Sequence, residues 1–228
     1  MMIKAEGISR TFFRNGSNSN YFYAVEKTDF TMEEGHLTAL IGRSGSGKTT
    51  FSNMLCGLLT PDEGKVFIDG KDLYSLPDEE RAYFRNRVFG IIPQGQTGLQ
   101  SLTVIENVLL PAAMYGDGSE KKDKAEELLK RLKIESLKEV YANELSGGEL
   151  RRMAIARALI NDPQIIIADE PTGDLDDEST GDVLKLLKET ADNGAAVLLV
   201  THDREVLKYA DAVYRMNKGV LTLHREES

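Results

Sequence analysis

The sequence predicts an α/β fold in which a mainly parallel sheet carries an N-terminal antiparallel β-subdomain and an inserted helical subdomain. Two observations lead to this prediction. Short apolar runs rich in Val, Ile and Leu alternate with segments whose apolar residues recur three or four apart, as buried parallel strands and their covering helices do. The alternation is broken by two strand-like segments at the start and by a long helical stretch in the middle.

Strand-like segments over 3–13 and 21–32 flank a polar run at 15–20, which predicts a hairpin. Apolar runs then predict buried strands over 37–41, 88–92, 165–168, 196–200 and 212–216. Helical periodicity predicts helices over 48–59, 149–160 and 179–191.

The stretch 95–141 has no strand signal, and its second half is rich in lysine and glutamate with leucines on one helical stripe. We therefore expect a single domain over 1–228. Its sheet-containing core would take about 1–93 and 161–228, and its helical subdomain about 94–160.

Composition excludes several classes of protein. The net charge of −9, from 28 Lys plus Arg against 37 Asp plus Glu, argues against a dedicated nucleic-acid surface. The single cysteine, Cys56, excludes an internal disulfide and a cysteine-based zinc site, and it suits a reducing compartment. The longest apolar runs are strand-sized, far below the roughly 20 residues that span a bilayer. Any membrane role is therefore expected to come through a partner.

A glycine-rich loop lies where the strand 37–41 ends and the helix from 48 begins. The loop consists of Gly42, Arg43, Ser44, Gly45, Ser46, Gly47, Lys48, Thr49 and Thr50. Its first eight residues fit the pattern G-x-x-x-x-G-K-[ST], whose backbone N–H groups curl around phosphate oxygens while the lysine reaches the terminal phosphates. Thr49 offers a hydroxyl to Mg²⁺. The loop predicts a P-loop NTPase core of the RecA-like kind, against the alternative of a flexible Gly/Ser turn.

Two carboxylates, Asp169 and Glu170, follow the apolar strand 165–168. A buried strand delivers them to the carboxyl edge of the sheet, where open α/β sheets bind ligands. We expect Asp169 to hold Mg²⁺ through water and Glu170 to orient and polarise the water that attacks a γ-phosphate. The alternative is a solvated acidic turn.

The run Leu-Ser-Gly-Gly-Glu at 145–149 directly precedes a helix. Alone, it reads either as a helix cap with Ser146 as N-cap or as a second phosphate-binding helix terminus. Together with the glycine-rich loop and the two carboxylates, it resembles the ABC ATPase family, whose signature is this Leu-Ser-Gly-Gly stretch. The resemblance covers essentially the whole chain.

The resemblance implies further roles. Gln94 would link the core to the helical subdomain and reach Mg²⁺ and the attacking water, and Asp176 would belong to a loop crossing a dimer interface. His202 would contact the γ-phosphate, although a histidine at a strand end is more often merely hydrogen-bonded. Adenine would stack on Phe12 or on Phe13, and strand alternation alone cannot decide between them.

In this family, the signature and the phosphate loop belong to opposite sides of a dimer. The resemblance therefore implies that two copies sandwich two ATP molecules head to tail. The signature residues Ser146, Gly147 and Gly148 of one copy would face the γ-phosphate held by Lys48 of the other.

The segment 99–111, together with Phe-Arg-Asn-Arg at 84–87, resembles the branch that serves lipoprotein release, macrolide export, antimicrobial-peptide resistance and bacterial cell division. This implies a separate integral membrane permease docking near residues 95–115, with the chain cytoplasmic and peripheral on the inner face of the membrane. The cargo would be a lipoprotein, a peptide or a drug-like molecule. The alternatives are transmembrane signalling, regulation of cell-wall hydrolysis, or a non-transport ABC ATPase.

Two departures from the family pattern add negative charge near the expected nucleotide: Glu149 stands where the signature usually has glutamine, and Asp174 where the branch has asparagine. We hypothesise that Glu149 weakens dimer closure or makes it depend on pH.

Overall fold

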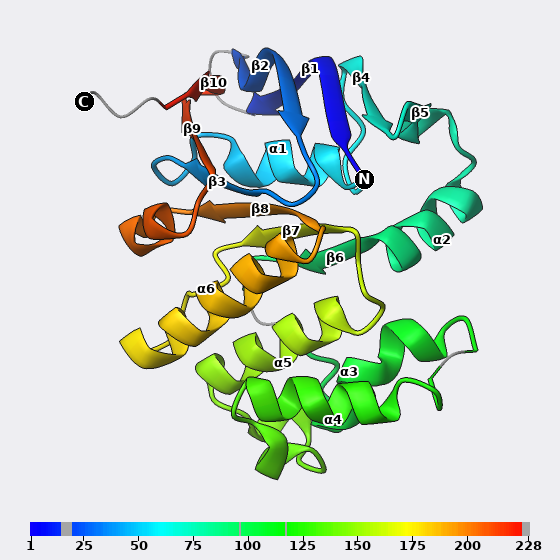
Figure 1. Cartoon of the computed structure of the whole chain (residues 1–228). Helices are drawn as coiled ribbons and strands as arrows, with labels where there is room; N and C mark the ends of the chain where they lie inside the picture. Colours follow the sequence, from blue (N-terminus) through cyan, green and yellow to red (C-terminus); the bar gives the residue numbers. More distant parts are fainter. Residues whose placement is uncertain (15–19, 96, 117, 225–228) are drawn as a thin grey trace.

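Two sheets enclose the helix α1 (Lys48–Leu55), and further helices cover the outer face of the larger sheet (Figure 1). The computed structural model describes residues 1–14, 20–95, 97–116 and 118–224. Within this part of the chain, the smaller sheet is antiparallel and has the strand order β2-β1-β4-β5. The larger sheet has the order β10-β9-β3-β8-β7-β6 and is parallel except for β10 at its edge.

The strands have the following bounds. The smaller sheet consists of β1 (Ile3–Arg14), β2 (Asn20–Met32), β4 (Glu63–Ile68) and β5 (Lys71–Asp72). The larger sheet consists of β3 (Leu37–Ile41), β6 (Phe89–Ile92), β7 (Ile165–Asp169), β8 (Ala196–Thr201), β9 (Ala212–Asn217) and β10 (Val220–Leu223).

The remaining helices are α2 (Asp78–Val88), α3 (Val104–Ala113), α4 (Lys122–Arg131), α5 (Gly147–Leu159) and α6 (Asp177–Asp192). Short 3₁₀ turns lie at Leu73–Ser75, Glu135–Leu137, Ala142–Glu144 and Arg204–Lys208. Figure 1 shows α5 and α6 below the larger sheet, with α3 and α4 lower still.

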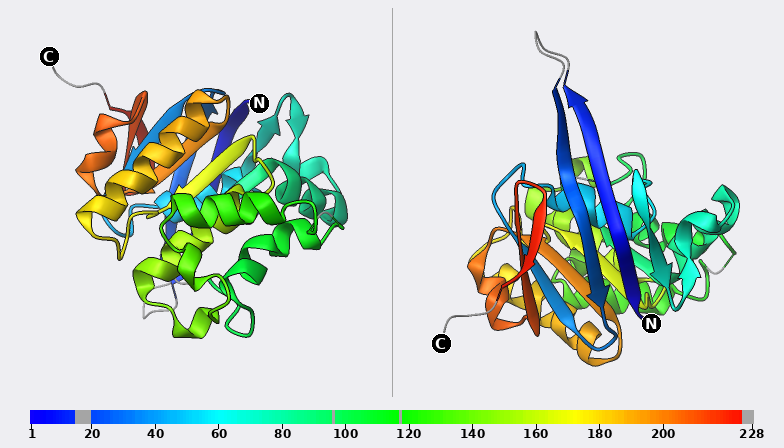
Figure 2. Two further views of the ribbon diagram at one scale, coloured as in Figure 1. Left: turned by 60° about the horizontal axis from the view of Figure 1, so that its bottom comes forward. Right: turned by 90° about the horizontal axis from the view of Figure 1, so that it is seen from above.

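The predicted fold class is confirmed, and every predicted strand is present. The first two strands pair antiparallel and extend away from the body (Figure 2), while the polar tip predicted at 15–20 lies largely outside the described residues. Helix α1 ends at Leu55, earlier than predicted, because Cys56 caps it and Gly57 follows with φ 72°. The sequence analysis did not predict β4, β5, β10 or α2.

The larger sheet is buried on both faces because its strands alternate between two apolar clusters. In β7, Ile165 and Ile167 pack toward α1, whereas Ile166 and Ala168 pack toward the lower helices. All four are at most 2% exposed. This two-sided burial explains why such strands read as continuous apolar runs in the sequence.

Helix α1 fills the space between the two sheets with its apolar side chains. Phe51 is fully buried and meets the ring of Phe30 from β2 edge-on, with centroids 5.2 Å apart. Phe30 in turn contacts the ring of Tyr214 from β9, at 5.1 Å. These rings join the antiparallel sheet to the larger sheet.

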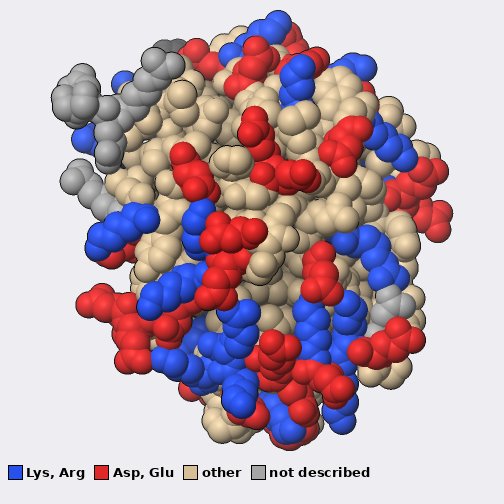
Figure 3. Space-filling view, in the orientation of Figure 1, with Lys and Arg blue, Asp and Glu red and all other residues tan. Residues whose placement is uncertain are grey.

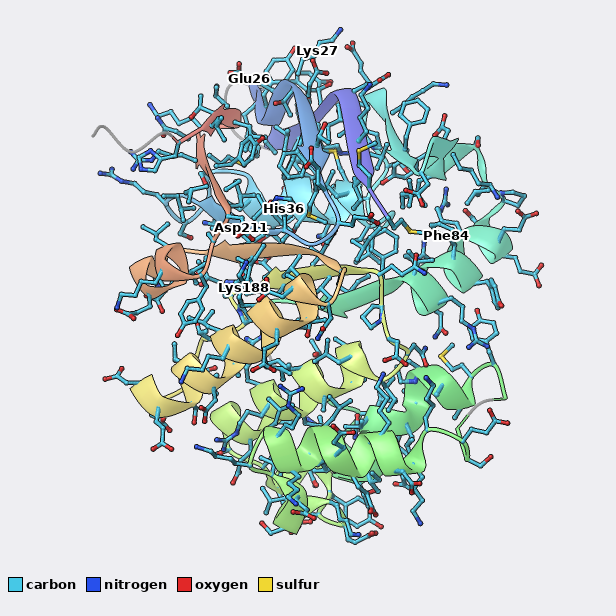
Figure 4. All side chains as sticks on the ribbon, in the orientation of Figure 1. Glu26, Lys27, His36, Phe84, Lys188 and Asp211 are labelled. Carbon is cyan, nitrogen blue, oxygen red and sulfur yellow. The ribbon has the colours of Figure 1, made fainter. Side chains whose placement is uncertain are left out.

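A polar contact fixes α6 to the starts of β3 and β9 (Figure 4). Lys188 donates from Nζ to both carboxylate oxygens of Asp211, each at 2.8 Å. Asp211 also accepts the backbone N–H of Leu37 at 2.8 Å. The contact lies at the opposite end of β3 from the glycine-rich loop, so it holds the sheet without touching that loop.

Positive and negative side chains are interspersed over the helical half of the surface seen in Figure 3. Lys133, after α4, contacts two carboxylates of α6, Glu178 at 2.6 Å and Asp182 at 2.7 Å. Arg131 pairs with Glu189 further along α6. Exposed pairs of this kind contribute little individually, so packing rather than charge holds these helices.

Among the described residues, no helix combines the length and the apolar composition that a membrane crossing requires.

We expect Phe51→Ala to lower the free energy of unfolding by about 3–5 kcal/mol, because a fully buried ring leaves a cavity between two sheets. Equilibrium urea denaturation measures this. Leu58→Ala, at a side chain that is 53% exposed, serves as the control and should stay within about 0.5 kcal/mol of the parent. Equal losses in the two variants would contradict the assigned core.

Candidate functional site

The glycine-rich loop connects β3 to α1 and closes tightly against neighbouring backbone. A Cβ atom on Gly42 would lie 2.4 Å from the carbonyl oxygen of Met216, and one on Gly47 would lie 2.0 Å from that of Ala24. Gly47 also has φ 108° at the helix N-cap. Only glycine fits these two positions, which explains the spacing of the motif.

Lys48 crosses back over the loop instead of pointing to solvent. It is buried, and its Nζ donates to the carbonyl oxygens of Gly42 at 2.8 Å and Arg43 at 3.2 Å. The ammonium group therefore lies at the mouth of the loop, where backbone N–H groups and the start of α1 favour an anion.

An open cleft of about 1170 Å³ lies in front of the loop. Most of the predicted site residues line it: Phe12, Arg43, Ser44, Gly45, Gly47, Lys48, Thr49, Thr50, Gln94, Asp169, Glu170 and His202. Gly42 and Ser46 belong to the loop but do not line the cleft. The predicted residues Ser146, Gly147, Gly148 and Asp176 lie outside the cleft as well.

Thr49 and Asp169 meet at the inner end of the cleft. The Thr49 hydroxyl donates to Asp169 Oδ2 at 2.6 Å. Burial raises the pKa of Asp169, and the charge of the adjacent Glu170 adds to the shift, while Thr49, Lys48 and Arg151 oppose it. A buried carboxylate with this environment is suited to a cation close by.

Glu170 follows β7 in a conformation that few non-glycine residues adopt, with φ 51°. Its N–H donates to the carbonyl of Val200 at 2.7 Å, which fixes the backbone to β8. Its two carboxylate oxygens contact His202 Nδ1 at 2.9 Å and Thr201 Oγ1 at 3.1 Å. The carboxylate is thereby oriented in the cleft, whereas the His202 side chain is 79% exposed.

At the outer end of the cleft, the strand pairing shows which of the two alternative phenylalanines lines the cleft. Phe12 lies opposite Phe22 of β2, and both rings line the cleft with centroids 6.2 Å apart. Phe13 lies opposite Tyr21, and their rings pair at 5.3 Å. Phe12 is therefore the ring placed in the cleft, and Phe13 is not among the residues that line it.

Several lining residues were missed by the sequence analysis: Phe22, Tyr23, Ala24, Glu26, Gly95, Arg151, Gly173 and Lys218. Asp174, which the sequence analysis expected near the nucleotide, also lines the cleft. The register of the first hairpin could have indicated Phe22, because it lies directly across from Phe12. No local signal indicated Arg151, since its position depends on how α5 packs against the sheet.

The signature run forms a complete N-terminal cap on α5. Ser146 accepts the N–H of Glu149, and the Glu149 carboxylate accepts both the Ser146 N–H at 2.8 Å and its hydroxyl at 2.7 Å. These hydrogen bonds to Ser146 lower the pKa of Glu149. Glu149 therefore remains a carboxylate between pH 6 and 8, and its own titration does not supply the pH dependence hypothesised from the sequence.

Comparison with known proteins identifies the family to which the chain belongs. The family model described as ABC transporter matches residues 25–173. The ABC transporter ATP-binding protein YtrE of Bacillus subtilis is 37% identical over 96% of both chains. The lipoprotein-releasing system ATP-binding protein LolD of Treponema denticola is 37% identical over 96% of this chain and 97% of the relative.

The macrolide export ATP-binding/permease protein MacB of a Shewanella species is 38% identical over 96% of this chain, which spans only 34% of that relative. A solved dimer of the ATP-binding cassette MJ0796 in a post-hydrolysis state, bound to ADP and Pi, is 33% identical and superposes with a TM-score of 0.89 over 98% of this chain and 99% of that one. The chain belongs to the ABC transporter family and is an ATP-binding ATPase. The branch suggested by the sequence motifs is confirmed by the relatives.

We expect Glu149→Ala to lower the free energy of unfolding by about 1 kcal/mol through loss of the cap. Because the folded-state pKa of Glu149 lies below its ordinary 4.5, the stabilisation is present above the unfolded pKa and is lost as the pH falls through the folded one. Urea denaturation should give a constant difference between parent and variant from pH 6 to 8 and a shrinking one below 4.5. A difference that changes between pH 6 and 8 would contradict this assignment.

Proposed function

We propose that this chain binds and hydrolyses Mg²⁺-ATP as a head-to-tail homodimer that drives a separate membrane permease in the export or extraction of a lipoprotein, a peptide or a drug-like substrate. One observation carries the homodimer. The phosphate loop and the residues suited to hydrolysis share one cleft, whereas Ser146, Gly147, Gly148 and Asp176 lie outside it. A second copy is needed to bring a signature to the cleft.

The geometry of the cleft suggests a role for each of its main residues. The loop and Lys48 would hold the β- and γ-phosphates, and Phe12 would stack on the adenine ring. Glu170 would orient the attacking water, since its carboxylate is held by Thr201 and by His202. His202, exposed at the edge of the cleft, would contact the γ-phosphate.

The residues present fit Mg²⁺. Thr49, Asp169 and Gln94 offer hydroxyl, carboxylate and amide oxygens, the ligand types that this ion prefers, and the first two are in contact at 2.6 Å. No group of three His, Cys, Asp or Glu side chains able to hold a metal occurs among the described residues. Proteins commonly bind Mg²⁺ through one or two carboxylates together with substrate phosphates. When bound, Mg²⁺ would neutralise charge on the phosphate oxygens.

The docking surface for the permease would lie near residues 95–115, at the boundary between a core of about 1–93 and 161–228 and a helical subdomain of about 94–160. Large apolar side chains are exposed there, notably Leu99, Met114 and Tyr115, and Tyr83 of α2 meets Tyr115 at 5.0 Å. A hollow of about 200 Å³ between α2, α3 and α5 lies close by. Such exposed apolar groups favour a protein partner, which would keep the chain cytoplasmic at the membrane's inner face.

We expect Glu170→Gln to form a stable dimer with ATP and Mg²⁺, because the carboxamide no longer polarises the water while the phosphate contacts survive. Multi-angle light scattering measures the mass. Lys48→Ala should lose ATP binding itself, and Glu178→Gln, at a carboxylate 81% exposed on α6, should keep parental turnover. A Glu170→Gln variant that stays monomeric with bound ATP would overturn the homodimer.

We expect Phe12→Ala to weaken nucleotide binding by about 1–3 kcal/mol, or about five- to 150-fold in Kd, because base–aromatic stacking is lost. Calorimetric titration with a non-hydrolysable ATP analogue gives the Kd. Phe13→Ala is the matched control and should stay within about twofold, since that ring pairs with Tyr21 outside the cleft. A larger effect at Phe13 than at Phe12 would reverse the assignment.

A further inference from the structure

The segment that carries Gln94 leaves the sheet after β6 and is held by two arginines of the signature helix α5. Arg151 donates from Nη1 to the carbonyl of Pro93 at 2.8 Å. Arg157 donates from Nη1 to the carbonyl of Thr97 at 2.6 Å and from Nη2 to its hydroxyl at 2.9 Å. The two arginines therefore hold the chain on either side of Gln94, at Pro93 and at Thr97.

Arg151 occupies an unusual position for a cation. Its side chain is 5% exposed and lines the inner part of the ATP cleft with Gln94 and Glu170. A Cβ atom on Gly173 would lie 4.0 Å from its Nη2, so the turn after β7 passes directly beside the guanidinium. A buried arginine is costly unless its charge and donors are used.

Negative charges around Arg151 account for its burial. Burial lowers the pKa of the guanidinium, and the carboxylates of Asp174, Asp169 and Glu170 oppose this shift. Lys48 is the other buried cation that acts on Asp169, from the loop side, and His202, directly after β8, contacts Glu170. Arg151 thus balances the extra negative charge that Asp174 brings to this end of the cleft.

We propose that Arg151 is a positioning residue that, with Arg157, locks the residues flanking Gln94 to the signature helix as one body. The proposal rests on the ATP cycle proposed above. In that cycle, Gln94 serves the nucleotide in its own cleft, while Ser146, at the start of the same helix, serves the nucleotide of the second copy. The lock makes the placement of Gln94 depend on the placement of Ser146.

The arrangement predicts how the loss of Arg151 changes the kcat and the KM of ATP hydrolysis. Arg151 does not touch the phosphate loop or Phe12, so ATP binding in the ground state survives its loss. Without Arg151, Gln94 is no longer held in its position relative to Glu170. A misplaced Gln94 near the reacting groups lowers turnover. We therefore expect Arg151→Met to lower kcat by about tenfold or more while the KM for ATP stays within about twofold.

The test is steady-state ATP hydrolysis by the purified full chain, with urea denaturation of each variant. Arg151→Lys should restore part of kcat, because lysine keeps the charge and one donor to Pro93, and Arg157→Met should lower kcat in the same way as Arg151→Met. Arg131→Met is the matched control, since that arginine pairs with Glu189 on the helical surface, and it should retain parental kcat. If Arg151→Met does not fold, Arg151→Gln takes its place with the same expected split.

A kcat within twofold of the parent, a rise in KM that accounts for the whole loss, or an equal loss in Arg131→Met would each overturn the proposal. The outcome is separable from that of the homodimer. A monomeric Glu170→Gln variant combined with a kcat-specific loss in Arg151→Met would refute the dimer and keep the lock. A stable Glu170→Gln dimer combined with parental kcat in Arg151→Met would keep the dimer and refute the lock.

Discussion

The parallel register of the central strands, which are buried on both faces, assembles the site because it brings their carboxyl ends to one edge of the sheet. Along the order β3-β8-β7-β6, Ile41 lies beside Thr201, Val200 beside Asp169, and Ala168 beside Ile92. The chain segments that leave these strand ends carry the glycine-rich loop, His202, Glu170 and Gln94. Residues distant in the sequence therefore reach one cleft because the apolar alternation of the strands fixes their register.

The tight seat of the glycine-rich loop also places the antiparallel sheet. Gly47 has no room for a side chain because the backbone of Ala24 in β2 passes over it, and Gly42 is pressed against Met216 in β9 in the same way. The strand that touches the loop continues to Phe22, whose partner across the hairpin is Phe12. The contact that forces glycine at the phosphate end thus brings aromatic rings to the other end of the cleft.

Much of this could be predicted from the sequence, because the strong signals are local. Apolar runs fixed the strands, and the spacing of Gly42, Gly47 and Lys48 fixed the loop. Helix α2 escaped notice because it buries none of its residues and so shows no apolar stripe. The choice between Phe12 and Phe13 also escaped, since alternation shows that they face opposite ways but not which face meets the cleft.

Arg151 shows the limit of local reasoning most clearly. In the sequence it is one of two adjacent arginines, and nothing separates it from Arg152, which instead contacts Ser179 of α6. Only the packing of α5 beneath the sheet turns one toward the carboxylates. On a rigid helix, Ser146 and Arg151 are five residues and about 8 Å apart along the axis. The signature therefore lies outside the cleft, yet a shift of its helix must move the side chain that holds the Gln94 segment.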